Sequence, residues 1–237
     1  MRCIANMPSG IIYPFSQKNG QLQMQLDEKM LFKTILDGRA RFRIYDWEEP
    51  TISLGRFQEK LKTHFLQIKR ITGGRAVLHE NDITYAISLP QQLIPQNKSI
   101  SFIYKSLVQP VKDAIEETYS IHLEFAATQK SLKTTQNRKQ PCFLSPSFKE
   151  LLFKGKKIMG AAMIKKKNGL LQHGTILFKP TEKWQKEFQG SNCIGLHTIE
   201  PGITKDTICK ALSQAFQKAF PINWESFSDF QDLFNRE

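Results

Sequence analysis

Apolar residues change their spacing several times along this chain, and this alternation limits the fold classes open to it. Between residues 22 and 36 they recur every three to four positions, as in an amphipathic helix. Residues 40–47 instead alternate apolar and polar side chains with a period of two, which is typical of a half-buried strand. Further helices are expected from a cap at Ser101 to about residue 119, and at about 204–220. The pattern predicts an α+β fold with a mainly antiparallel sheet and segregated helices.

Strand patterns occupy much of the remaining chain. They lie at residues 51–54, 83–89, 148–154, 158–164 and 170–178. The last three are separated by short turn signals, so we expect them to form a meander. The polar and basic segment 128–141 offers almost nothing to bury and is predicted to be a mobile loop. The 237 residues fit one large domain or two small ones.

The chain carries a net charge of +12, from 34 Lys and Arg against 22 Asp and Glu. Such a surplus first suggests nucleic acid, but the basic residues are scattered apart from a solvated turn at 165–167. We therefore expect no nucleic-acid partner. Acidic proteins are favoured instead, because a positive surface attracts them by electrostatic steering.

The sequence indicates neither a membrane span nor a signal peptide. No stretch approaches the roughly 18 apolar residues of a membrane helix, and the first residues lack a continuous apolar core. We expect a cytoplasmic protein without a membrane partner. Its four cysteines, Cys3, Cys142, Cys193 and Cys209, show no metal-site spacing and suggest no disulfide framework. A functional cysteine would therefore act alone, and no metal site is predicted.

Two glycines and a histidine form the first group of candidate functional residues. Gly73 and Gly74 lie between Arg70 and Arg75, ahead of a strand-like run that contains His79. Paired glycines allow a positive φ and the close approach of a ligand, and the flanking arginines can hold an anion or a polarised carbonyl. The same dipeptide also fits an ordinary tight turn, and the histidine also fits a structural role near a strand end. The residues alone leave these alternatives open.

A second group of candidates follows the predicted loop. Cys142 has basic neighbours that increase the thiolate fraction a nucleophile needs, although an inert buried thiol is the alternative. Lys157 begins an apolar strand, where it can act as an acid, a base or a carbonyl ligand, or extend its charge to water. Lys156 belongs to the turn, so the two lysines point to opposite faces if both are extended. His173 and Gly174 again pair a histidine with a glycine in a strand.

Taken together, these segments resemble the lipoate-protein ligase and octanoyltransferase superfamily, whose catalytic domain is similar to that of biotin protein ligases. The motifs that carry the resemblance follow one order along nearly the whole chain: LDEKML, RIYDWEEPTISLGRFQ, RITGGRAVLH, CFLSPS, GKKIMGAA and LLQHGTILF. The form GGRAVLHENDITY and the cysteine of CFLSPS are more similar to the cysteine-dependent protein octanoyltransferases than to the ATP-dependent ligases. The resemblance implies a biotin/lipoate protein ligase catalytic-domain-like fold, with one catalytic domain over residues 1–237.

The resemblance also implies a role for each candidate residue. Cys142 would be the acyl-accepting nucleophile, and Lys157 would be the lysine at the acyl carbonyl. The acyl site would be lined by Arg70, Gly73, Gly74, Arg75, His79, His173 and Gly174. The chain departs from the family at 160–163, where Gly-Ala-Ala-Met replaces the common Gly-Ser-Ala-Gln. This departure removes side chains that hydrogen-bond near the acyl group.

The implied reaction moves an octanoyl or lipoyl group from acyl carrier protein, through a cysteine thioester, to a lysine of a lipoyl-domain protein. Acceptors of this kind include the glycine cleavage H protein and the E2 component of 2-oxoacid dehydrogenases. No cofactor is expected for this transfer. Two alternatives remain: an ATP-dependent lipoate-protein ligase that uses ATP and Mg²⁺ to form a lipoyl-adenylate, and a non-catalytic module that binds acyl groups or proteins. Consumption of ATP separates the first two, and a mass shift on the acceptor lysine separates both from the third.

Overall fold

A computed structural model describes residues 8–126, 150–181 and 192–235. Its main sheet has the strand order β11-β12-β7-β3-β1-β13, with β2 also paired to β3. The strands are β1 (Ser9–Ile12), β2 (Ser16–Lys18), β3 (Ala40–Trp47), β7 (Asp82–Pro90), β11 (Met159–Lys166), β12 (Gly169–Leu177) and β13 (Asn223–Ser226). The four strands from β11 to β3 pair antiparallel, whereas β1, β2 and β13 join in parallel. The sheet is therefore mixed, and the predicted α+β class is confirmed.

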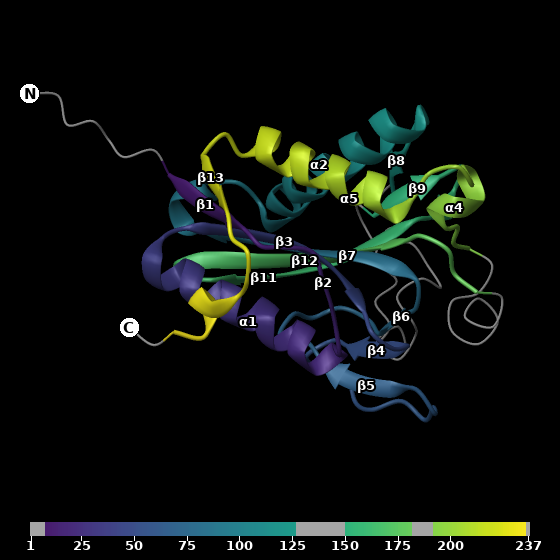
Figure 1. Cartoon of the computed structure of the whole chain (residues 1–237), viewed down its shortest axis with the longest axis horizontal. Coiled ribbons are helices and arrows are strands. Elements are labelled where there is room, and N and C mark those ends of the chain that lie inside the picture. Colours follow the sequence, from purple (N-terminus) through teal and green to yellow (C-terminus); the bar gives the residue numbers. More distant parts are fainter. Residues whose placement is uncertain (1–7, 127–149, 182–191, 236–237) are drawn as a thin grey trace, which may run out of the picture.

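Helices cover both faces of this sheet (Figure 1). Helix α1 (Gly20–Asp37) packs on one face, and α2 (Ile100–Tyr119) packs against α5 (Lys205–Ala219) on the other. Each begins where a side-chain oxygen of Asn19, Ser99 or Thr204 accepts a hydrogen bond from a backbone N–H of the first turn. The described chain adds the short helix α4 (Leu196–Ile199) and the 3₁₀ turns η1 (Gln91–Leu93) and η5 (Gln231–Leu233). None of the described helices is long and apolar enough to cross a membrane.

Strand β3 lies where the sequence predicts it, but its polar side chains are not exposed. Phe42 and Ile44 pack in the core between the sheet and the α2/α5 pair. Arg41 and Arg43 point to the opposite face and are 2% and 0% exposed. The prediction of a half-buried strand is therefore wrong, because α1 covers the face that carries the arginines. Burial of that face requires partners for each guanidinium. Arg41 pairs with Asp37 at the end of α1, whereas Arg43 pairs with Asp27, which belongs to the candidate site.

Two small sheets flank the main one. The first has the order β5 (Leu66–Lys69), β4 (Thr51–Leu54), β6 (Val77–His79), and the second has the order β10 (Lys156–Lys157), β9 (Leu151–Phe153), β8 (Glu124–Phe125). The predicted three-strand meander is thus wrong: β11 and β12 form a hairpin in the main sheet, while β9 turns back on β10 and pairs with β8. Turn residues in the sequence indicate which neighbouring strands form a hairpin. The strand that pairs on the other side of each hairpin strand is instead set by packing between distant segments. The predicted mobile loop at 128–141 lies outside the described residues.

Candidate active site

A cavity of about 40 Å³ lies between the α1 face of the main sheet and the β4–β6 part of the first small sheet. The predicted residues that line it are Arg70, Gly74, Arg75, His79, His173 and Gly174. Of the other predicted residues in the described chain, Gly73 and Lys157 are not part of its lining. Cys142 lies outside the described residues. The fold therefore brings together most of the predicted acyl-site residues from segments that are distant in the sequence.

Arg70, at the end of β5, uses its guanidinium to hold the glycine turn. Its Nη2 donates to the carbonyl oxygens of Gly73 and Arg75, at 2.9 and 2.8 Å. Its Nη1 donates to the Ser53 carbonyl at 2.7 Å, and its Nε donates to Thr72 Oγ1 at 3.2 Å. A planar guanidinium with several fixed acceptors restrains the backbone that it bridges. Arg70 thus shapes the loop that borders the cavity.

The two glycines of this turn differ in what the backbone requires of them. Gly74 has a φ of +92°, and a Cβ there would lie 3.0 Å from Arg70 Nη2. Gly55 packs against the same turn so closely that its Cβ would lie 2.1 Å from the Gly74 oxygen. A Cβ on Gly73 would meet nothing within 4 Å. Gly74 is therefore required by the turn itself, whereas Gly73 leaves open space beside it.

His79, at the end of β6, is held from three sides. Its Nδ1 lies 2.8 Å from Asp82 Oδ2, and its Nε2 lies 2.7 Å from Ser53 Oγ. Because a carboxylate only accepts, Nδ1 carries the hydrogen of the first bond. The ring stacks on Trp47 with centroids 3.9 Å apart. Glu80, the other carboxylate near it in sequence, instead accepts a hydrogen bond from Thr181. These contacts fix the orientation of the His79 imidazole, which lines the cavity.

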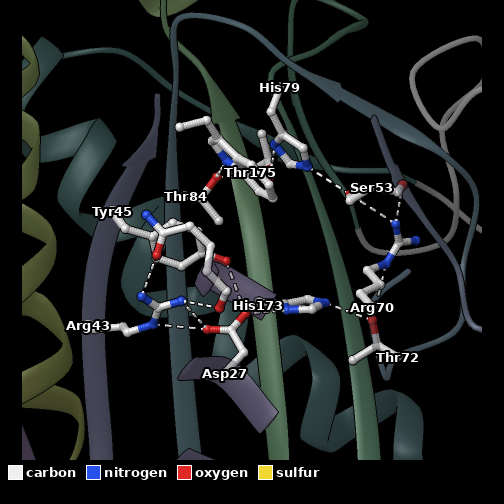
Figure 2. A network of polar contacts seen from close by, with 12 residues as sticks. Asp27, Arg43, Tyr45, Ser53, Arg70, Thr72, His79, Thr84, His173 and Thr175 are labelled. Atoms are coloured by element: carbon white, nitrogen blue, oxygen red, sulfur yellow. Dashed lines mark hydrogen bonds and ion pairs between the residues drawn. The ribbon is translucent and has the colours of Figure 1, made fainter. Parts of the chain in front are cut away.

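His173 stands on β12 and connects the cavity to α1 (Figure 2). Its Nδ1 lies 2.8 Å from Asp27 Oδ2, and its Nε2 lies 2.7 Å from Thr72 Oγ1. Asp27 Oδ1 accepts bonds from Arg43 Nε and Nη2 at 2.9 and 2.7 Å. Tyr45 donates its hydroxyl to Asp27 Oδ2 at 3.0 Å. One buried carboxylate thereby fixes a histidine, an arginine and a tyrosine.

The pKa values in this network follow from burial and charge. Burial lowers the pKa of His173 below its usual range, and the hydrogen bond and charge of Asp27 oppose this shift only in part. Burial tends to raise the pKa of Asp27, but the Arg43 charge and the His173 hydrogen bond outweigh it, so the pKa is lowered. The site therefore holds an ionised Asp27 beside an imidazole that resists protonation.

The two neighbouring lysines face in opposite directions, as the sequence predicts. Lys156 is exposed, whereas Lys157 is fully buried and its Nζ lies 2.7 Å from Glu150 Oε1. Lys157 also forms a parallel β-bridge with Cys193. Burial raises the pKa of the Cys193 thiol to about 11, although the charge of Lys157 acts in the opposite direction. A thiol of this kind is mainly protonated near neutral pH and is a poor nucleophile.

Sequence reasoning did not identify Asp27 or Arg43 as site residues. Asp27 lies on the buried face of α1 between Met24 and Met30, and Arg43 was assigned to the polar side of a half-buried strand. A carboxylate on an apolar helix face and alternating arginines in a strand were the available signals. Only the packing of α1 on β3 shows that they meet.

Residues 19–217 match the family model "Lipoyl protein ligase A/B catalytic domain". The chain belongs to this family. The curated relatives compared with this chain are octanoyltransferases. The octanoyltransferase of Oceanobacillus iheyensis is 35% identical over 171 residues, covering 67% of this chain and 60% of the relative. The octanoyltransferase of Bacillus subtilis is 26% identical over 240 residues, covering 88% of this chain and 85% of the relative. The chain thus spans less than two thirds of the first relative and most of the second.

Solved structures of the lipoyl protein ligase family share the fold. Lipoate-protein ligase A bound with ATP matches with a TM-score of 0.73 at 17% identity, covering 96% of this chain and 92% of that one. Biotin protein ligase from Leishmania major in complex with biotin matches with a TM-score of 0.51 at 11% identity, covering 86% and 71%. At such identities the likeness shows the fold alone, and it confirms the predicted catalytic-domain architecture.

Proposed function

We propose that this lipoyl protein ligase family member is an octanoyltransferase of protein lipoylation, with one catalytic domain over residues 1–237. The observation that carries the proposal is its similarity to octanoyltransferases along most of the chain. The motif cysteine Cys142 and the buried Lys157 add the two groups that a thioester mechanism needs. Acyl carrier protein is the proposed donor, and a lipoyl-domain protein is the proposed acceptor. The cytoplasmic location predicted from the sequence belongs to the same proposal.

The proposed reaction has two displacement steps. The Cys142 thiolate attacks the donor thioester carbonyl, and the carrier's phosphopantetheine-type thiolate leaves. The neutral amine of the acceptor lysine then attacks the enzyme thioester, the Cys142 thiolate leaves, and the amine loses its proton. Each step passes through an oxyanion, which the Lys157 ammonium and the Gly73 and Gly74 amides stabilise.

The acyl chain is proposed to lie in the cavity on the α1 face. The present volume of about 40 Å³ is far below the roughly 300 Å³ of small ligand pockets, so the walls must separate to admit an acyl group. The glycine turn borders β11: a Cβ on Gly74 would lie 3.7 Å from Ala162 Cβ. Ala161 and Ala162 line the cavity with small apolar side chains, which suit an acyl tail.

Charge supports acidic protein partners for this chemistry. A groove of about 680 Å³ beside the cavity has apolar walls on α1 and β11, with Phe32 63% exposed. The basic residues around it are Arg56, Lys69, Arg70, Lys166 and Lys167, against one acidic residue, Glu28. A net charge of +12 extends this positive field beyond the groove. Long-range attraction of an acidic carrier or acceptor is the expected result.

The two adjacent lysines provide the test. Lys157→Ala is expected to lower octanoyl transfer to an acceptor protein by at least about 10²-fold, because an oxyanion contact is lost. Lys156→Ala removes the same charge one residue away and is expected to retain most activity. Transfer is measured as the mass shift of the acceptor, with ATP removed by a phosphatase.

Equal losses in the two lysine variants, or a folded Lys157→Ala variant with normal activity, would contradict the catalytic assignment. Strict dependence on ATP would favour the ligase instead. Absence of any mass shift on the acceptor would favour the non-catalytic module.

A further inference from the structure

The hairpin of β9 and β10 decides which lysine points inward. Its loop consists of Lys154 and Gly155, with φ values of +48° and +75°. Two consecutive residues with positive φ are typical of the tight two-residue turn whose twist suits a hairpin. This turn sets the register in which Lys156 pairs with Phe153 and Lys157 pairs with Leu152. A slip by one residue would exchange the faces of the two lysines.

The same register brings Glu150 beside Lys157. Directly opposed residues of an antiparallel pair point to the same face, and so do residues two apart on one strand. Glu150, two residues before Leu152, is therefore a diagonal neighbour of Lys157. Its backbone is fixed by a 2.8 Å bond from Ala126 N–H to its carbonyl. The side chains meet as a buried pair, with Nζ 2.7 Å from Oε1 and exposed fractions of 0% and 3%.

We propose that Glu150 is the positioning residue for Lys157, a role that rests on the proposed function. A lysine side chain has four rotatable bonds, and its ammonium has no preferred direction of its own. A carboxylate at 2.7 Å in a buried site selects one rotamer and offsets the cost of desolvating the charge. The Lys157 side chain is thereby ordered before a substrate binds, and only its approach to the oxyanion remains to be made.

The test replaces the carboxylate without changing its size. Glu150→Gln is expected to lower the rate of acyl-enzyme formation on the order of 10²-fold, as for a misplaced catalytic group, with little change in the acceptor KM. Glu150→Asp keeps the charge on a shorter side chain and should give an intermediate rate. The matched control is Glu124→Gln, which removes an exposed carboxylate from β8 in the same small sheet and should keep the normal rate. Melting temperatures identify variants that do not fold.

A double-mutant cycle separates positioning from a general structural effect. In a Lys157→Ala background, Glu150→Gln should change the remaining rate by less than about twofold, since no ammonium remains to be positioned. An equal fractional loss of rate in both backgrounds, or a normal rate in folded Glu150→Gln, would show that Glu150 does not position Lys157. Neither result would contradict the proposed catalytic role of Lys157. If Glu150→Gln does not fold, a normal rate in Glu150→Asp overturns the positioning role. Full activity of Lys157→Ala would overturn the proposed lysine function itself, together with this inference.

Discussion

The two faces of the main sheet are built by the same strands, yet one carries the larger apolar core and the other combines a smaller apolar cluster with a buried polar network. On the α2/α5 side, Phe42 and Tyr85 pack against Phe216 with ring centroids 4.5 and 5.3 Å apart. On the α1 side, Arg43 and His173 meet Asp27 (Figure 2). Strand alternation thus places the core beneath α2 and α5 and the residues that border the cavity on opposite faces of the sheet.

The polar face tolerates burial because its donors have acceptors. Arg43 donates to Asp27 from Nε and Nη2, to Gln23 Oε1 from Nη1, and to the Gln23 carbonyl from Nη2. A buried charge without partners would cost several kcal/mol, so the network has to be complete before α1 can close over it. Removal of one partner from the polar face would leave a buried charge unpaired, whereas the apolar face loses packing energy in proportion to the volume removed.

The largest effect on stability is expected on the apolar face. Phe216→Ala should lower the free energy of unfolding by about 3–5 kcal/mol, because it removes a fully buried ring from between α5 and the sheet. Urea denaturation measures the loss, and the folded fraction should retain its transfer activity. Phe57, 80% exposed, is the control, and Phe57→Ala should change stability by no more than about 0.5 kcal/mol. Loss of transfer activity in folded Phe216→Ala would contradict the claim that the α2/α5 face contributes to stability alone.

A smaller, pH-dependent effect is expected on the polar face. Burial lowers the pKa of folded His173 below its ordinary 6.5, so the unfolded chain binds a proton at higher pH than the folded one. The free energy of unfolding should therefore fall as pH drops below about 6.5, by at most about 1.4 kcal/mol per pH unit from this residue. The lowered pKa of Asp27 acts only near and below 3.8, outside this window.

His173→Gln tests this assignment, since it removes the titrating group. Urea denaturation at about pH 7.5 and about pH 5.5 should show a smaller loss of stability in the variant than in the parent protein. Equal losses would show that another group is responsible.

The smallest effect concerns the charge around the groove. Raising the ionic strength from about 0.05 to about 0.5 M should lower kcat/KM for the acceptor severalfold, because exposed charges are screened over a few ångströms. Replacing Lys166 and Lys167 by Gln should weaken this salt dependence without changing the melting temperature. A kcat/KM that does not change with ionic strength would contradict electrostatic steering of the acceptor.

Local patterns predicted most elements, because helix and strand periods depend on near neighbours. The strands at 40–47 and 51–54 match β3 and β4 residue for residue. The predicted cap at Ser101 is wrong: α2 begins at Ile100 and is capped by Ser99, two residues earlier. The meander failed because β9 and β11 belong to different sheets, and strand partners far along the chain leave no local signal.

The site was predicted in part for the same reason. His79, His173 and Gly74 are conspicuous in the sequence as histidines and glycines within or beside strands, and the structure gathers them around one cavity. Asp27 and Arg43 have ordinary positions in an amphipathic helix and an alternating strand. Their importance arises only from burial, which depends on how α1 crosses the sheet.

The most direct test of the proposed mechanism is the mass of the protein itself after brief mixing with octanoyl carrier protein, in the absence of ATP and acceptor. We predict an adduct of one octanoyl group on the parent protein, lost when the acceptor is added and absent from Cys142→Ser, because the thioester requires sulfur at that position. An undiminished adduct in Cys142→Ser, or acceptor octanoylation without any enzyme adduct, would contradict covalent transfer through Cys142.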